Sequence, residues 1–182
     1  GSRLLWLPKF DAAEVASLLP RATAMMGVPT FYTRLLAEPS FTREACRTVR
    51  LFVSGSAPLL PETFRAFEAR TGQRILERYG MTETGMNTSN PLAGERRPGT
   101  VGPPLPGVSV RIVDDRGAPC PRGTVGGIEV KGPNVFAGYW NMPEKTREEF
   151  TADGWFRTGD VGRMSDDGYV EIVGRAKDLI IT

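Results

Sequence analysis

The chain has 182 residues, of which 40% are hydrophobic and 24% are charged, the balance of an ordinary globular protein. Its net charge of +2 and its scattered basic residues argue against nucleic-acid binding, and no apolar run approaches the roughly 20 residues that would cross a bilayer. The chain contains no histidine, which excludes a Ser-His-Asp or Cys-His mechanism and histidine-ligated zinc within it.

The two cysteines, Cys46 and Cys120, lie far apart and outside any paired motif. This usage favours a reducing compartment, the cytoplasm, and no disulfide framework. The apolar stretch near the N-terminus spans only four residues and has no cleavage site, so no signal peptide is expected. The sequence leaves the oligomeric state open.

The first half of the chain alternates short apolar runs with helical patterns. The strand candidates are 4–7, 24–28, 49–53 and 75–79. Asp11 is a typical N-cap, and Glu14 three residues later completes a capping box for a first helix. Pro29 and Pro61 suit the first turns of two further helices, and Gly72 suits the end of the second of these. This alternation predicts a parallel sheet with flanking helices.

After Asn90 the composition changes. The Pro- and Gly-rich residues 98–107 predict a boundary between subdomains. Strand candidates separated by turns follow at 108–113, 127–131, 155–157 and 169–173, with one helix expected over about 143–150. The expected fold is therefore α/β, with a partial parallel sheet and flanking helices over residues 1–97 and a small antiparallel β subdomain over residues 98–174.

A loop of small residues follows the predicted strand 49–53. Gly55, Ser56 and Ala57 would let a flat ring approach the backbone. Ligands bind beyond the carboxyl ends of the strands in parallel sheets, so this loop is a candidate binding site. Its composition is also that of an ordinary serine-rich turn.

A second candidate loop, residues 77–84, follows Leu76. In it Tyr79 can stack on a ring, Thr82 can hydrogen-bond a phosphate and Glu83 can ligate magnesium. The helix between the two loops makes them one βαβ unit, so we expect them to lie side by side. An ordinary glycine turn is the alternative.

Four short motifs follow one another along the chain. In order they are Tyr79-Gly80-Met81-Thr82-Glu83; Gly127-Ile128-Glu129-Val130-Lys131-Gly132 with Gly138-Tyr139; Trp155-Phe156-Arg157-Thr158-Gly159-Asp160; and Gly174-Arg175-Ala176-Lys177-Asp178. Each motif alone is weak, because strings such as Thr-Gly-Asp occur by chance in many loops. In this order and at this spacing they resemble the acyl-adenylate-forming superfamily of acyl-CoA synthetases, luciferases and peptide-synthetase adenylation domains, over essentially the whole chain.

The resemblance implies a fragment of the N-terminal domain of an adenylate-forming enzyme that uses ATP, Mg²⁺ and CoA. The nucleotide-binding positions that it implies are Gly55, Ser56, Ala57, Arg78, Tyr79, Gly80, Met81, Thr82, Asp160 and Arg175. Thr82 and Glu83 take the catalytic positions, and Glu83 is the implied metal ligand. Asp160 would accept hydrogen bonds from both ribose hydroxyls, as acidic residues do in dinucleotide sites.

The last motif implies the start of a hinge over residues 175–182. Arg175 would reach the ribose or a phosphate with charge-assisted hydrogen bonds. Lys177 would occupy the hinge about which a C-terminal lid rotates between adenylation and thioester formation. An exposed basic turn is the alternative for residues 175–177.

Longer stretches narrow the substrate class. Residues 27–34, 53–57 and 77–89 are similar to those of malonyl-CoA synthetases. That resemblance implies that Arg34, Ser56 and Arg78 line the pocket for the second carboxylate of malonate. A fatty-acid enzyme would need an apolar tunnel there, because a buried unpaired arginine is costly. A surface position on the helix after Pro29 is the alternative for Arg34.

The implied parent enzyme joins malonate to CoA through a malonyl-adenylate, so its partners are small molecules rather than nucleic acid or membrane. Methylmalonate, a medium-chain fatty acid or an aryl acid are the alternative substrates. The superfamily's phosphate-binding loop and C-terminal lid are expected to lie outside these 182 residues, so the chain alone is expected to be inactive. A non-catalytic nucleotide-binding or truncated product is the remaining alternative.

Overall fold

The computed structural model describes residues 3–178, which form two compact units. Of the described residues, the first unit comprises 3–77 with Leu92–Gly99, and the second comprises Arg78–Pro91 with 100–178. Within the described residues, no helix is long and apolar enough to cross a membrane. The sequence-based division at residues 97 and 174 stays a prediction, and the last four residues of the predicted hinge lie outside the described residues.

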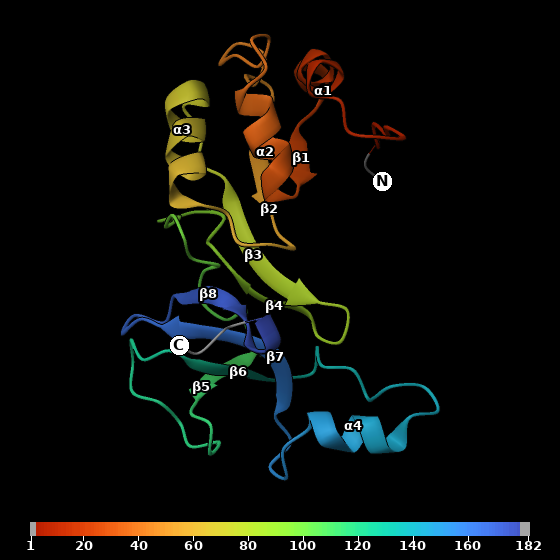
Figure 1. Ribbon diagram of the computed structural model, residues 1–182. Helices are drawn as coiled ribbons and strands as arrows, with labels where there is room; N and C mark the ends of the chain where they lie inside the picture. The colour runs from red at the N-terminus through yellow and green to blue at the C-terminus, as the bar shows by residue number, and fades with distance from the viewer. Residues whose placement is uncertain (1–2, 179–182) are drawn as a thin grey trace. The chain divides into compact units, whose positions relative to one another are not determined.

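The first unit is built around parallel strands accompanied by helices (Figure 1). Its strands are β1 (Ala24–Gly27), β2 (Leu51–Ser54) and the start of β3 (Leu76–Met81); its helices are α1 (Ala12–Leu18), α2 (Pro29–Leu36) and α3 (Pro61–Thr71), with a short 3₁₀ helix over Leu19–Arg21. Parallel pairing places Met26 opposite Val53, and Val53 opposite Leu76. The predicted parallel sheet with helices is confirmed.

The helix ends follow local signals in the sequence. Asp11 is extended, and its Oδ1 accepts a hydrogen bond from the Glu14 amide at 2.9 Å, which caps α1. Pro29 and Pro61 occupy the first turns of α2 and α3. Gly72 ends α3 with a φ of 74°, a left-handed conformation that glycine adopts without steric strain.

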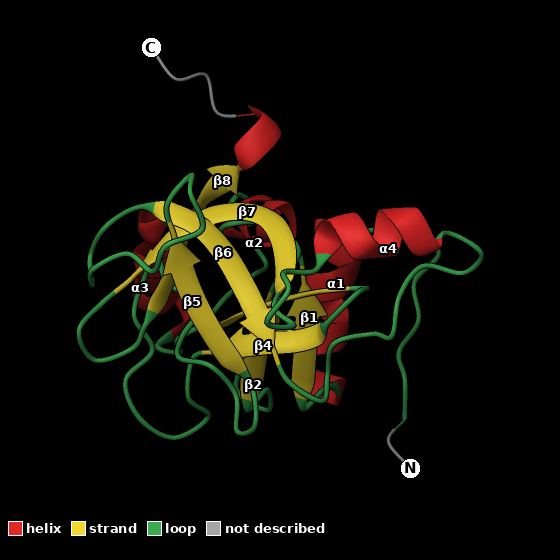
Figure 2. Ribbon diagram, turned by 90° about the horizontal axis from the view of Figure 1, so that it is seen from below, coloured by secondary structure: helices red, strands yellow, loops and turns green. Residues whose placement is uncertain are grey.

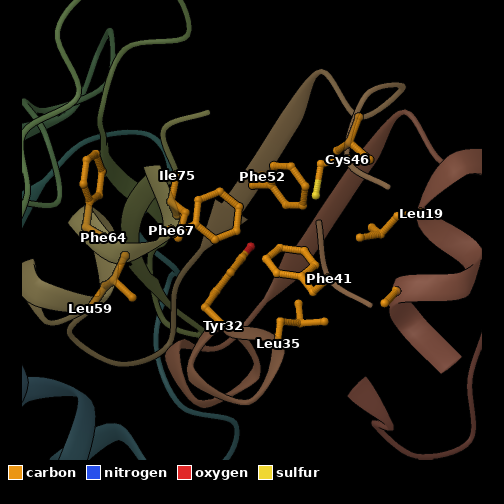
Figure 3. Packing of buried hydrophobic residues seen from close by; sticks show 12 residues of the cluster. Leu19, Tyr32, Leu35, Phe41, Cys46, Phe52, Leu59, Phe64, Phe67 and Ile75 are labelled. Atoms are coloured by element: carbon orange, nitrogen blue, oxygen red, sulfur yellow. The ribbon is translucent and has the colours of Figure 1, made fainter. Parts of the chain in front are cut away.

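An aromatic cluster fills the interior of the first unit (Figure 3). The ring of Phe67 on α3 meets those of Tyr32 on α2 and Phe52 on β2 edge to face, with centroids 5.5 Å and 4.9 Å away. All three side chains are fully buried. The Tyr32 hydroxyl donates to the Val53 carbonyl at 2.6 Å, so this buried polar group is satisfied. Burial of these rings packs α2 and α3 against β2.

The strand predicted at residues 4–7 is wrong. These residues have no regular secondary structure, and Leu4 and Trp6 are 76% and 79% exposed. An apolar run becomes a strand only where a neighbouring strand supplies hydrogen bonds and a covered face. Within the described part of the chain, β1 pairs with β2 and no strand pairs with residues 4–7.

In the second unit, the end of β3 forms an antiparallel hairpin with β4 (Gly85–Ser89), in which Tyr79 lies opposite Thr88. The strand predicted at residues 75–79 is therefore confirmed in the main and is two residues longer at its end, and the part of the candidate loop 77–84 that lies in β3 is wrong. Residues through Met81 belong to β3, and only residues 82–84 form the turn. The sequence did not predict β4, because this strand consists mostly of polar residues and lacks the alternation of apolar and polar side chains that indicates a strand.

A four-stranded antiparallel sheet in the second unit confirms the predicted β subdomain, and Figure 2 shows β5, β6 and β7 side by side. Its strands are β5 (Ser109–Val113), β6 (Gly126–Lys131), β7 (Phe156–Met164) and β8 (Val170–Arg175); α4 (Pro143–Glu149) lies between β6 and β7, and a 3₁₀ helix, Ala176–Asp178, follows β8. β7 is longer than the predicted strand 155–157 because it pairs with both β6 and β8. Burial alternates along it, so that Phe156, Thr158 and Asp160 are buried.

Candidate functional site

Asp160 is a buried carboxylate to which two other predicted site residues bind. It is only 6% exposed, because the alternation along β7 turns it to the covered side. The Tyr79 hydroxyl donates to Asp160 Oδ2 at 2.5 Å, and Arg175 Nε lies 2.9 Å from Oδ1. Arg175 is in reach because β8 pairs with β7 in a register that places it opposite Asp160. The structure thus brings Tyr79, Asp160 and Arg175 together.

Thr158 fixes the main chain beside Asp160. Its hydroxyl accepts a hydrogen bond from the Asp160 amide at 3.1 Å and donates to the Ile128 carbonyl of β6 at 2.8 Å. Arg175 Nη1 donates to the Thr158 carbonyl at 3.2 Å. Thr158 lies within the third motif, but this role was not predicted from the sequence. These contacts hold the carboxylate in one orientation.

The Tyr79 hydroxyl keeps its proton at neutral pH and therefore donates a hydrogen bond to the Asp160 carboxylate. Burial raises the pKa of Tyr79 above its ordinary value, and the hydrogen bond to Asp160 raises it further. Each carboxylate oxygen has two lone pairs, so Asp160 can accept further hydrogen bonds beyond those from Tyr79 and Arg175. The site therefore presents the Asp160 carboxylate as a hydrogen-bond acceptor in a fixed orientation, with the Tyr79 ring beside it.

Glu83 lies in the turn between β3 and β4. The Thr84 amide closes this turn by donating to the Met81 carbonyl at 3.1 Å. Thr82 is exposed and Glu83 is half-buried. The Tyr139 hydroxyl donates to Glu83 Oε1 at 3.0 Å. Tyr139 belongs to the second motif, but no role was predicted for it from the sequence.

The carboxylate of Glu83 fits one mode of magnesium binding. Among residues 3–178, no three or more His, Cys, Asp or Glu side chains gather to hold a metal ion. Mg²⁺ at phosphate-transferring sites is commonly bound by one or two carboxylates together with substrate phosphates and water. A partly exposed carboxylate with one oxygen held by Tyr139 suits that mode.

The loop after β2 contains a residue in an unusual conformation. Ser56 has a φ of 68°, in the left-handed region that residues other than glycine seldom adopt. Such residues cluster at binding sites and active sites. Ser56 and Ala57 are exposed, and Gly55 is half-buried. Their part in nucleotide binding stays a prediction.

Glu77 anchors the end of this loop in the first unit. Its Oε1 accepts a hydrogen bond from the Leu59 amide at 2.8 Å, and it lies opposite Ser54 in the pairing of β2 with β3. Glu77 is 2% exposed, and this burial raises its pKa to about 7. Glu77 was not predicted as a site residue, because no local pattern in the sequence shows that its carboxylate is buried.

Glu77→Gln is expected to remove a pH dependence of stability. Because the pKa of Glu77 is raised from 4.5 to about 7 on folding, the stability linked to its protonation is complete below about pH 4.5 and is lost as the pH rises through 7. From about pH 4.5 to pH 8, the free energy of unfolding of the variant should rise relative to wild type by about 2–3 kcal/mol. Urea unfolding across this range measures the difference, and a constant difference would contradict the titration.

Arg34, Arg78 and Lys177 lie on three different elements. Arg34 is exposed in the last turn of α2, with its guanidinium carbon 4.7 Å from the centroid of the Phe10 ring. Arg78 is half-buried on β3, and Lys177 is exposed in the final 3₁₀ helix. Arg34 and Ser56 belong to the first unit and Arg78 to the second, so their grouping around a carboxylate stays a prediction. The hinge function of Lys177 stays a prediction as well.

Gly80 has a packing role that explains its place in the first motif. A Cβ at this position would lie 2.1 Å from the Gly85 carbonyl oxygen and 2.3 Å from Met86 Cε. Glycine therefore lets β3 approach β4 where the pairing shifts register. Met81 ends β3 and is half-buried. Contacts of Gly80 and Met81 with a nucleotide stay predictions.

Known proteins match the chain along most of its length. The family of AMP-binding enzymes matches residues 1–140. Malonate–CoA ligase of Arabidopsis thaliana is 48% identical over 161 residues, which cover 84% of this chain and 26% of that protein. Sulfoacetate–CoA ligase of Cupriavidus necator is 49% identical over 156 residues, which cover 85% of this chain and 30% of that protein. The chain thus spans less than a third of these two relatives.

A solved structure agrees with the fold. ATP-bound MatB from Rhodopseudomonas palustris is 61% identical and matches with a TM-score of 0.95, over 97% of this chain and 35% of that one. The parallel strands with helices and the antiparallel sheet are those of the N-terminal domain of adenylate-forming enzymes. Since the family match covers residues 1–140 of 182, the chain belongs to the family of AMP-binding enzymes.

Proposed function

We propose that the chain is the adenylate-binding part of an ATP-dependent acid–CoA ligase whose acid is malonate. The observation that carries the proposal is the buried Asp160 carboxylate, held between the Tyr79 hydroxyl and Arg175. Membership in the AMP-binding family supports it. In the proposed reaction the malonate carboxylate attacks the α-phosphorus of ATP and releases pyrophosphate. The thiol of CoA then attacks the acyl carbon and releases AMP.

The ribose and adenine are the parts of the nucleotide proposed for this site. Both ribose hydroxyls would donate to Asp160, which has free lone pairs on each carboxylate oxygen. The ring of Tyr79 would stack on adenine, and the exposed Thr82 hydroxyl would donate to a phosphate oxygen. Such a site needs no protein nucleophile, because holding the two reactants in line and stabilising the developing charge accelerate the reaction.

Mg²⁺ is the proposed metal, with Glu83 as its protein ligand. When bound with ATP, the ion neutralises part of the phosphate charge. The half-buried carboxylate of Glu83, with Oε1 held by Tyr139, supports this assignment.

Malonate is proposed as the acid because of the relatives and the arginines. The two relatives described above are ligases for malonate and for sulfoacetate, acids that each carry a second anionic group. Arg34, with Arg78 and Ser56, would pair with the second carboxylate, since a guanidinium can meet a carboxylate with two parallel hydrogen bonds. Sulfoacetate is the second candidate, favoured by the similarity to the Cupriavidus necator enzyme.

We also propose a cytoplasmic location. Cys46 and Cys120 are both free thiols. Burial raises the pKa of Cys46 to about 11, which keeps it in the unreactive thiol form. Free thiols of this kind are typical of a reducing compartment.

Exchange of labelled pyrophosphate into ATP tests the proposed reaction in the whole enzyme that carries this chain. Malonate is expected to support exchange, and butyrate or octanoate to support it at least roughly 10²-fold less well. Equal exchange with octanoate would contradict the substrate class. Failure of exchange with every acid, malonate and sulfoacetate included, would contradict adenylation itself.

A further inference from the structure

The segment between β6 and α4, residues 132–142, contacts the turn between β3 and β4, and we call it the clamp loop. The Phe136 amide donates to the Glu83 carbonyl at 2.8 Å. The Tyr139 hydroxyl donates to Glu83 Oε1 at 3.0 Å. The clamp loop therefore holds Glu83 through both its main chain and its carboxylate.

Asn134 of the clamp loop holds the same turn without help from Tyr139. Its Nδ2 donates to the Thr84 carbonyl at 2.7 Å and to Asn87 Oδ1 at 3.2 Å. These hydrogen bonds and the one from Phe136 do not involve the Tyr139 hydroxyl. Loss of that hydroxyl should therefore leave the turn folded, so a variant without it isolates the effect of the hydrogen bond on the Glu83 carboxylate.

Tyr139 is itself fixed in place. Its amide donates to Thr146 Oγ1 on α4 at 2.9 Å, and its ring meets that of Phe136 edge to face at 4.9 Å. A Cβ at Gly138, where φ is 147°, would lie 2.6 Å from Thr146 Cγ2, so glycine permits this approach. A tyrosine hydroxyl carries its proton at neutral pH, so it can donate to the Glu83 carboxylate.

We propose that Tyr139 is a positioning residue that holds the Glu83 carboxylate ready for magnesium-bound ATP. The inference rests on the proposed function, in which Glu83 is the metal ligand. A free glutamate side chain loses rotamer freedom when it binds an ion. A donor on one carboxylate oxygen reduces that loss and leaves the other oxygen for the ion. Hydrogen bonds of this kind to metal-binding carboxylates orient the ligand and strengthen metal binding.

Tyr139→Phe tests this role, because it removes the hydroxyl and keeps the ring. Calorimetry of ATP binding to the whole enzyme, with excess Mg²⁺ and with EDTA instead, separates metal-dependent from metal-independent affinity. We expect the gain in ATP affinity that Mg²⁺ brings to fall about tenfold in the variant, the loss of one hydrogen bond to a charged group. ATP affinity in EDTA should stay as in wild type.

Three further variants control the result. Tyr32→Phe removes a buried hydroxyl that donates to the Val53 carbonyl, so it should lower Tm without changing the effect of Mg²⁺. Thr146→Val keeps the Tyr139 hydroxyl but removes the acceptor of the hydrogen bond from the Tyr139 amide. Part of the gain in ATP affinity that Mg²⁺ brings should therefore be lost. If Tyr139→Phe does not fold, Thr146→Val provides the test in its place. In a Glu83→Gln background, Tyr139→Phe should have no further effect, because both act through one carboxylate.

ATP binding by the wild-type enzyme tests the proposed function separately. If wild type binds no ATP with Mg²⁺ or with EDTA, the proposed function fails and the positioning role fails with it. If wild type binds ATP and Tyr139→Phe keeps the full gain from Mg²⁺, only the positioning role is overturned. An equal loss of affinity with Mg²⁺ and with EDTA would also overturn it, since that pattern indicates a merely structural role.

Discussion

Asp160→Ala is expected to weaken ATP binding to the whole enzyme about 10²-fold or more, because two ribose hydroxyls lose a charged acceptor. Hydrogen bonds to charged groups contribute about 1.5–3 kcal/mol each. The substitution also removes the carboxylate that orients the Tyr79 hydroxyl and Arg175. Calorimetry with ATP and with a non-hydrolysable acyl-adenylate analogue measures the loss.

Two further variants are matched controls. One separates the charge of Asp160 from its size, and the other tests whether the loss of any aspartate weakens ATP binding. Asp160→Asn keeps the size and one acceptor oxygen but loses the charge, so its affinity should lie between those of wild type and Asp160→Ala. Asp166→Ala removes an exposed aspartate from the turn between β7 and β8 and should bind ATP as wild type does. Thermal unfolding checks that each variant is folded. Wild-type affinity in a folded Asp160→Ala would contradict the proposed ribose contact.

Arg34→Leu is expected to lower kcat/KM for malonate roughly 10³-fold or more while it creates some activity on butyrate. Polar sites built for a charged group can discriminate by roughly 10⁴–10⁵ against acids that lack it, because the site's own charge is then desolvated without a partner. Leucine removes that penalty for monoacids and removes the partner of the second carboxylate. Comparison of kcat/KM for malonate, sulfoacetate, butyrate and octanoate measures the change in preference.

Stability should change little in Arg34→Leu. Arg34 is exposed, and its guanidinium contacts the face of Phe10 at 4.7 Å. A cation–π contact at an exposed site contributes about 0.5–1 kcal/mol. A large loss of activity on malonate would therefore not arise from unfolding, and Tm measurements check this.

Two other arginine variants sharpen the test of substrate class. Arg34→Lys should not restore malonate activity, because a lysine cannot form two parallel hydrogen bonds with a carboxylate. Arg65→Leu changes an exposed arginine on α3 and should leave the acid preference unchanged. A wild-type preference for octanoate, or an unchanged preference in Arg34→Leu, would contradict malonate as the acid. The proposal of adenylation would survive, because it rests on Asp160 and Tyr79.

The resemblance of short motifs predicted most residues of the candidate site, but it did not predict which of these residues contact one another. Tyr79 and Asp160 were both predicted to bind nucleotide, one through its ring and the other through its carboxylate. In the structure the Tyr79 hydroxyl also donates to Asp160, which lies 81 positions away in the chain. Pairing of β8 with β7 adds Arg175 to the same carboxylate. No local pattern contains these contacts.

Two residues of the candidate site were missed for the same reason. Tyr139 binds a carboxylate that is 56 positions away, and its own motif does not name that partner. Glu77 was predicted only as part of the strand 75–79 and as the first residue of the candidate loop 77–84, with no role of its own. Its raised pKa results from burial in the folded first unit, to which segments distant in the sequence contribute. A charged residue in a sequence does not reveal whether the fold exposes or buries it.

The sequence by itself determined the helix ends, the fold class and the family. Asp11 and Gly72 mark the ends of α1 and α3 because capping involves groups within one helical turn. Only the tertiary structure decided that residues 4–7 remain irregular and that β3 extends to Met81. A strand's hydrogen bonds come from a partner strand, and a carboxylate's environment comes from whatever the fold packs against it. Both are supplied by segments far away in the sequence.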